Sequence, residues 1–150
     1  MKLQEAANLF ERLKNETTKK SEIKIYQNFL QVLAQLEKRE FSKDEMQTIE
    51  SELDGLQLSS HTRNRKKYFG SAYRAFEKKL IDKFSLITKG YYTRMGVGLG
   101  LTFGVLLGII FFSNLDRSMG ISLGLGIGAT IGLGIGRSMD AKATSEGRVI

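Results

Sequence analysis

Glycine recurs at every fourth residue through two apolar segments of this 150-residue chain. The nine positions of this repeat are Gly96, Gly100, Gly104, Gly108, Gly120, Gly124, Gly128, Gly132 and Gly136. Residues four apart share one face of an α-helix, so each segment would carry a face without side chains. Such faces let two helix backbones approach closely, typically at a right-handed crossing. The repeat therefore predicts two helices that pack through glycine, with these nine residues as the helix-packing interface.

The residues around these glycines indicate a membrane. Residues 95–112 and 118–136 contain no charged side chain, and the only charges between them are Asp116 and Arg117, in the connecting loop at 113–117. As helices, the two segments would each be about 27–28 Å long, close to the bilayer core of about 30 Å. Because a bilayer offers no water to bond open backbone amides, helix is favoured there despite the glycine. We predict a transmembrane helical hairpin over residues 95–137.

The flanking charges predict the orientation of this hairpin. Five Lys and Arg residues lie within residues 78–94 and three within residues 137–150, whereas the loop offers Arg117 alone. Lys and Arg are enriched in cytoplasmic loops. Both termini are therefore expected in the cytoplasm, with residues 138–150 as a cytoplasmic tail.

The second segment also carries a row of small residues about 200° around the helix from its glycine repeat. This small-residue row consists of Ser122, Gly126, Thr130, Gly134 and Ser138. The first segment has only Gly98 and Thr102 in such a row. One small face can contact the other helix of the hairpin and leave the second face for a neighbouring subunit. We expect a homo-oligomer with the second helix at its centre.

The run from Gly96 to Gly136 resembles the glycine-zipper hairpins of small two-span bacterial membrane proteins that carry a helical cytoplasmic head. This resemblance implies a multi-pass protein of the bacterial inner membrane and no catalytic residues. A dinucleotide-binding loop at Gly98-Leu99-Gly100 is disfavoured, because such a loop follows a strand and precedes an acidic residue by about 20 positions.

The apolar pattern of residues 1–59 predicts a cytoplasmic head of three helices. Ser42 and Glu45 have the spacing of a capping box at the start of the third helix, and Gly55 is a plausible end for it. Apolar residues at helical spacing define the three expected inner faces. These are Leu3, Ala6, Phe10 and Leu13; Ile25, Phe29, Val32 or Leu33, and Leu36; and Met46, Ile49, Leu53 and Leu56. Ser59–Asn64 is the expected break after the head, with His61 as a solvated loop residue.

The charge and apolar spacing of residues 60–94 predict a basic amphipathic helix next to the membrane. They contain 10 basic and 2 acidic residues, and Phe69, Tyr73, Phe76, Leu80 and Phe84 follow helical spacing. One interpretation is a fourth bundle helix with solvated Lys and Arg, and the other is a helix resting on anionic lipid; the two are compatible. The expected lipid-facing residues are Arg65, Lys66, Lys67, Lys78, Lys79 and Lys83. Their position next to the membrane favours lipid over nucleic acid as the counter-charge, and no aromatic pattern of a nucleic-acid module accompanies them.

The predicted fold is therefore all-α: an N-terminal helical bundle followed by the transmembrane hairpin. The chain has no Cys and a single His, so it lacks the residues for thiolate or His-pair metal sites and for most nucleophilic catalysis. We expect no enzyme, cofactor or metal. The leading hypothesis is a self-associating membrane anchor or assembly module, with a possible protein partner for its head. The alternative is a homo-oligomeric pore.

Overall fold

The computed structural model describes residues 1–58, 64–111 and 117–150, and every regular element in these ranges is a helix. The six helices are α1 (Leu3–Glu16), α2 (Lys20–Glu37), α3 (Lys43–Gly55), α4 (Arg65–Phe84), α5 (Tyr91–Phe111) and α6 (Arg117–Ser145). The all-α prediction is confirmed. By its contacts the chain divides into two compact units, Met1–Leu86 together with Ile150, and Ile87–Val149.

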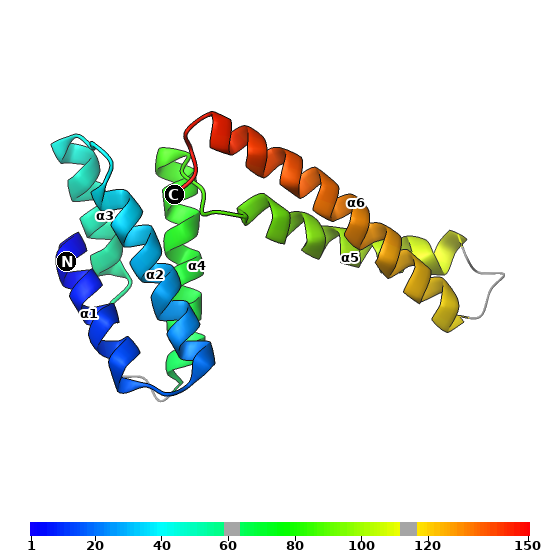
Figure 1. Ribbon diagram of the computed structural model, residues 1–150, viewed down its shortest axis with the longest axis horizontal. Helices are drawn as coiled ribbons and strands as arrows, with labels where there is room; N and C mark the ends of the chain where they lie inside the picture. The colour runs from blue at the N-terminus through cyan, green and yellow to red at the C-terminus, as the bar shows by residue number, and fades with distance from the viewer. Residues whose placement is uncertain (59–63, 112–116) are drawn as a thin grey trace. The chain divides into compact units, whose positions relative to one another are not determined.

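The first unit is a bundle of α1 to α4 around an aromatic core. In this unit α1 packs against α2, and α4 packs against both α2 and α3 (Figure 1). The rings of Phe10 and Phe29 stack with centroids 4.1 Å apart. The ring of Phe69 meets Phe10 edge-on at 5.9 Å and Tyr26 at 5.3 Å. Three helices thus contribute to one buried aromatic cluster.

This cluster extends the head beyond the expected limit of residue 59. Phe69, Phe76 and Leu80 of α4 are almost completely buried among residues of α1, α2 and α3. The basic segment therefore forms a fourth bundle helix, which was one of its two interpretations. This position in the bundle is favourable because burial of each of the three large apolar side chains contributes roughly 1.5–3 kcal/mol of stability.

Two helix ends in the head follow from local chemistry. The backbone amide of Ser42 donates to Glu45 Oε2 at 2.9 Å, and the Glu45 amide donates to Ser42 Oγ at 3.3 Å, which confirms the capping box. The third helix ends at Gly55, as expected. One inner face differs from the expectation: Tyr26 is fully buried in α2, whereas Ile25 is only half-buried.

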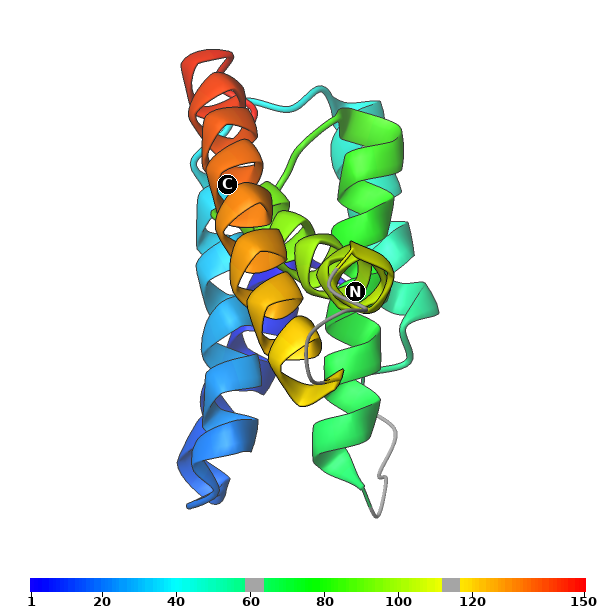
Figure 2. The same cartoon turned by 90° about the vertical axis from the view of Figure 1, so that its right-hand side faces the viewer.

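The second unit is a hairpin in which α5 and α6 run antiparallel side by side (Figure 1). Seen nearly along α5, α6 crosses it obliquely (Figure 2). Both helices exceed the expected bounds, because α5 begins at Tyr91 and α6 begins at Arg117 and ends at Ser145. The expected tail at 138–150 thus begins inside α6. The expected loop residues 113–116 and the break at 59–63, including His61, lie outside the described residues.

The C-terminal end of α6 is closed by a glycine turn. Gly147 has φ +67°, a left-handed conformation that favours glycine, and its amide donates to the Thr144 carbonyl at 3.0 Å. The Arg148 amide then donates to the Ala143 carbonyl at 3.0 Å. Beyond this turn, Ile87 and Val149 form a single parallel bridge. The residues that enter α5 and those that leave α6 therefore lie together.

Candidate helix-packing interface

The glycine repeats of α5 and α6 face each other in register. Gly96 lies opposite Gly132, Gly100 opposite Gly128, Gly104 opposite Gly124, and Gly108 opposite Gly120. The last glycine of the repeat, Gly136, lies against the backbone of Tyr92 and Thr93. All nine expected interface residues thus belong to one seam, and this seam lies within a single chain.

The seam has no room for a side chain. A methyl carbon added to Gly100 would overlap the carbonyl oxygen of Gly128, and one added to Gly128 would overlap that of Gly100. The same mutual overlap occurs between Gly104 and Gly124. At such separations, Cα–H groups contact carbonyl oxygens across the helices, with weak hydrogen bonds and van der Waals attraction. Glycine is therefore required here for close approach.

The seam ends in a polar contact at Asp140. This residue follows Gly136 by four positions, so it occupies the next place in the glycine repeat. Its Oδ1 accepts a hydrogen bond from the Tyr92 amide and its Oδ2 accepts one from the Thr93 amide, both at 3.0 Å. These amides are in the first turn of α5, where helix N–H groups lack intrahelical partners. A carboxylate of α6 thus caps the N-terminus of α5.

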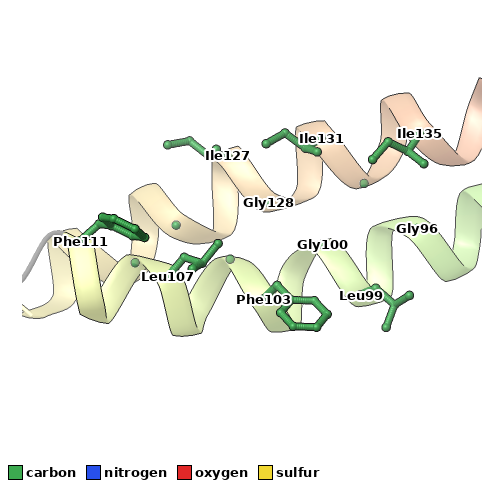
Figure 3. Close-up of a pocket in the computed structure, with 14 residues that line it drawn as sticks. Gly96, Leu99, Gly100, Phe103, Leu107, Phe111, Ile127, Gly128, Ile131 and Ile135 are labelled. Carbon is green, nitrogen blue, oxygen red and sulfur yellow. The ribbon is translucent and has the colours of Figure 1, made fainter.

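One face of the hairpin has a groove of about 470 Å³ along this seam, which we call the glycine groove. Its floor is formed by the glycines of the seam, and its sides by large apolar side chains of both helices (Figure 3). Leu99 and Phe103 point away from α6, whereas Leu107 and Phe111 extend toward it. The large side chains that line the groove are Leu99, Phe103, Leu107, Phe111, Ile127, Ile131 and Ile135.

The opposite face of the hairpin is better covered. By helical period, Val97 and Val105 of α5 and Leu125, Ala129 and Leu133 of α6 lie on that face. All five are half-buried, whereas Leu101 and Ile109 of the same face are 36% and 41% exposed. The lining residues Phe103, Ile131 and Phe111, in contrast, are 59%, 58% and 73% exposed. The side chains of the groove face are therefore more exposed than those of the opposite face.

No protein-family model, curated protein or solved structure matches this chain.

The helices of this hairpin are long and apolar enough to cross a membrane, over Tyr91–Phe111 and Ser118–Ser145. Within this unit, most of their large apolar side chains remain exposed. A helix of a soluble core would bury them. Exposed apolar surface of this extent is typical of a segment that meets lipid or another protein.

The small-residue row of α6 lies on the side of the helix turned away from α5. Gly126 and Gly134 have open space for an added methyl group, with nothing within 4 Å. The hydroxyl groups of this row bond to their own helix: Thr130 Oγ1 donates to the Gly126 carbonyl and Ser122 Oγ to the Ser118 carbonyl, both at 2.8 Å. The row is thus an edge of small side chains, in which the hydroxyl protons of Ser122 and Thr130 are already donated within α6.

Half of the expected lipid-facing basic residues make ion pairs inside the head. Lys79 and Lys83 lie 3.2 Å and 2.6 Å from the two carboxylate oxygens of Glu52, and Arg65 lies 3.7 Å from Glu16. These lysines hold the pKa of the Glu52 carboxyl below its usual value, chiefly through the hydrogen bond from Lys83. These three cations therefore have carboxylate partners within the protein.

The other three basic residues, Lys66, Lys67 and Lys78, are exposed and make no ion pair within the described part of the chain. They remain available to a counter-charge outside the head.

Asp140 was missed by the sequence analysis, although a signal for it existed. It continues the four-residue spacing of the glycines, and it is the only acidic residue of the described α6. A carboxylate in register with a glycine seam points directly at the neighbouring helix. Among the described residues, no group of three or more His, Cys, Asp or Glu side chains comes together as a metal site.

Proposed function

We propose that this chain is a small integral membrane protein that self-associates through its glycine-zipper hairpin and presents its helical head as an anchor or assembly module. The observation that carries the proposal is the pairing of two apolar helices through backbone contacts, with their large side chains turned outward. In water this arrangement would expose a large apolar surface. In a bilayer the same surface meets lipid at no cost, and both backbones keep their hydrogen bonds.

Self-association is supported by the surfaces that the hairpin leaves open. The glycine seam is occupied by the partner helix within the chain, so it is not available to a second copy. Two surfaces remain: the small-residue row on the outer edge of α6 and the glycine groove on one face. Helices in lipid associate through close packing, and both surfaces allow it.

The pore alternative draws less support from the side chains. A pore would need polar groups along its lining, and the candidates are Thr102, Ser122 and Thr130. Each of these hydroxyls donates its proton to a carbonyl of its own helix. In the described spans no charged side chain lies between Met95 and Phe111 or between Ser118 and Gly136. A path of this kind favours neither ions nor water.

The head is proposed to lie in the cytoplasm of a bacterium, with the hairpin in the inner membrane and both termini on the cytoplasmic side. The excess of Lys and Arg on both flanks of the hairpin supports this orientation. Lys66, Lys67 and Lys78 are the residues proposed to meet anionic lipid or an acidic protein partner. Each Lys or Arg near an anionic membrane contributes about 1 kcal/mol.

The proposal is tested by expressing the full chain in bacteria and measuring three properties. The protein should stay in the inner-membrane fraction after a carbonate wash, and native mass spectrometry from membranes should find an oligomer. Purified protein in planar bilayers should carry no current. A protein found in the soluble fraction would contradict the membrane assignment, and reproducible single-channel currents would favour the pore.

A further inference from the structure

The glycine groove allows the contact between two copies to be specified, provided that the proposed self-association holds. We propose that Ile127, Ile131 and Ile135 of α6, which we call the isoleucine ridge, pack into the glycine groove of a second copy. The second copy packs its own ridge into the groove of the first. The result is a symmetric dimer of hairpins.

The groove is continuous with an interface that already exists in the chain. Its floor is the exposed side of the α5–α6 glycine seam, so an incoming side chain would meet backbone atoms of both helices. The groove is lined almost entirely by apolar atoms. Leu99 and Phe103 point away from α6 at one end of the groove, whereas Leu107 and Phe111 extend toward α6 at the other end (Figure 3). The end lined by Leu99 and Phe103 is open to an apolar occupant.

The isoleucine ridge has the spacing that the groove requires. Its residues are four apart, a rise of about 6 Å per step. The glycines of the floor and the side chains of the α5 wall recur at this same interval. Ridges and grooves formed by residues four apart are the commonest elements of helix packing. Ile131 is 58% exposed in the single chain, so it is free to enter a second copy.

The contact can be reciprocal because α6 supplies both the ridge and one wall of the groove. Two copies inserted in the same direction can be related by a two-fold axis along the membrane normal. Each ridge then lies in the other groove, with the two α6 helices central and the two α5 helices peripheral. A ridge in this position touches two helices at once. Contact through the small-residue row would touch only one.

A second copy fits the groove better than a lipid chain does. An acyl chain has no fixed repeat and loses conformational freedom when it is held in one groove. An isoleucine on a helix has one strongly preferred χ1 rotamer, so it loses little freedom on packing. The ridge therefore loses less side-chain conformational entropy on packing than an acyl chain would lose.

Single cysteines in the full chain test this contact, because the natural sequence has none. Ile131→Cys places a thiol on the ridge, and Thr130→Cys places one at the same depth on the small-residue row. Both residues are exposed in the single chain. Under oxidation in native membranes, Ile131→Cys should form most of its protein as a disulfide dimer, while Thr130→Cys should stay largely monomeric on a denaturing gel. Ile110→Cys, on α5 and outside the groove, is the background control.

The remaining outcomes separate this contact from self-association in general. If Thr130→Cys crosslinks as well as Ile131→Cys, or better, the ridge contact is wrong and the small-residue row joins the copies. If native mass spectrometry finds an oligomer but neither cysteine crosslinks, the ridge contact is wrong while self-association stands. If only monomers are found and neither cysteine crosslinks, lipid covers the groove, and both proposals fail.

Discussion

Asp140 Oδ1 accepts a hydrogen bond from the backbone amide of Tyr92 at 3.0 Å, across 48 positions of sequence. Its second oxygen bonds the next amide, so one side chain of α6 satisfies two open donors of α5. Gly90, which precedes α5, has no side chain to cap it. Asp140 also matches the partial positive charge of a helix N-terminus. The contact aligns α5 and α6, because a shift of either helix along the seam would break both bonds.

Replacing Asp140 with Ala should loosen the first turn of α5. Loss of a capping side chain typically costs about 0.5–2 kcal/mol. Hydrogen exchange of the Tyr92 and Thr93 amides should accelerate, measured by mass spectrometry of the full chain in lipid nanodiscs. Asp140→Asn should have a smaller effect, because the amide retains one acceptor oxygen. Ser138→Ala, two residues earlier and exposed, is the control; equal acceleration in it would contradict the capping role.

Glycine at position 128 should be essential for the hairpin, and glycine at 126 should not. Gly128→Ala places a methyl group against the Gly100 carbonyl, and overpacking of this kind costs typically 1–3 kcal/mol. Gly126→Ala places the same group in open space. Thermal unfolding in detergent micelles should therefore show a lower midpoint for Gly128→Ala only. Equal midpoints would mean that the glycine seam does not hold the two helices together.

Removal of the hydroxyl group should affect the free energy of unfolding differently at two tyrosines of the head. Tyr26 Oη is buried without a hydrogen-bond partner among the described residues, and burial raises the pKa of this tyrosine. Tyr68 Oη donates toward the carbonyls of Leu56 and Gln57, at 2.9 Å and 2.8 Å. Tyr26→Phe should keep or raise the free energy of unfolding, since an unpaired buried hydroxyl costs about 1–3 kcal/mol.

Tyr68→Phe should lower the free energy of unfolding by about 0.5–1.5 kcal/mol, because it removes the hydrogen bond that Tyr68 donates to the backbone. Denaturant titration of the full chain in micelles, followed by circular dichroism, measures both variants. A clear loss of stability in Tyr26→Phe would indicate that its hydroxyl has a partner, such as a buried water.

The head should lose stability in acid through Glu52. The hydrogen bonds from Lys83 and Lys79 lower the pKa of this carboxyl from 4.5 in the folded protein, so the folded state favours the ionised form. Its contribution is fully present above the unfolded pKa and is lost as the pH falls through the lower folded pKa. Glu52→Gln should cost about 1 kcal/mol or less at pH 7 and have little effect in strong acid. Unfolding of both proteins from about pH 7 to pH 3 checks this, with exposed Glu37→Gln as the control.

The orientation of the hairpin predicts which cysteines an impermeant reagent reaches. Ser118→Cys, at the start of α6, should react with a membrane-impermeant maleimide added to spheroplasts. Ser51→Cys, on the exposed side of α3, should react only after lysis. This pattern is expected because the Lys and Arg residues on both flanks of the hairpin keep the head and the C-terminal end of α6 in the cytoplasm. The reverse labelling pattern would overturn the proposed topology.

The features that the sequence determined by itself are those encoded within one helix. The four-residue repeat of glycine shows which face of α5 and which face of α6 lack side chains, because the helical period places residues four apart on one face. The capping box of Ser42 and Glu45 is likewise a local contact over three residues. The all-α fold could be predicted for the same reason.

The features that only the tertiary structure decided depend on how separate helices meet. The aromatic residues of the basic segment suited a membrane surface and a bundle core equally well, and contact of Phe69 with Phe10 and Tyr26 placed them in the core. The pairing of Asp140 with Tyr92, and the groove along one face of the seam, require the register and crossing of α5 and α6. A helical repeat shows which residues face outward together, but the partner that each face meets is set by packing between distant parts of the chain.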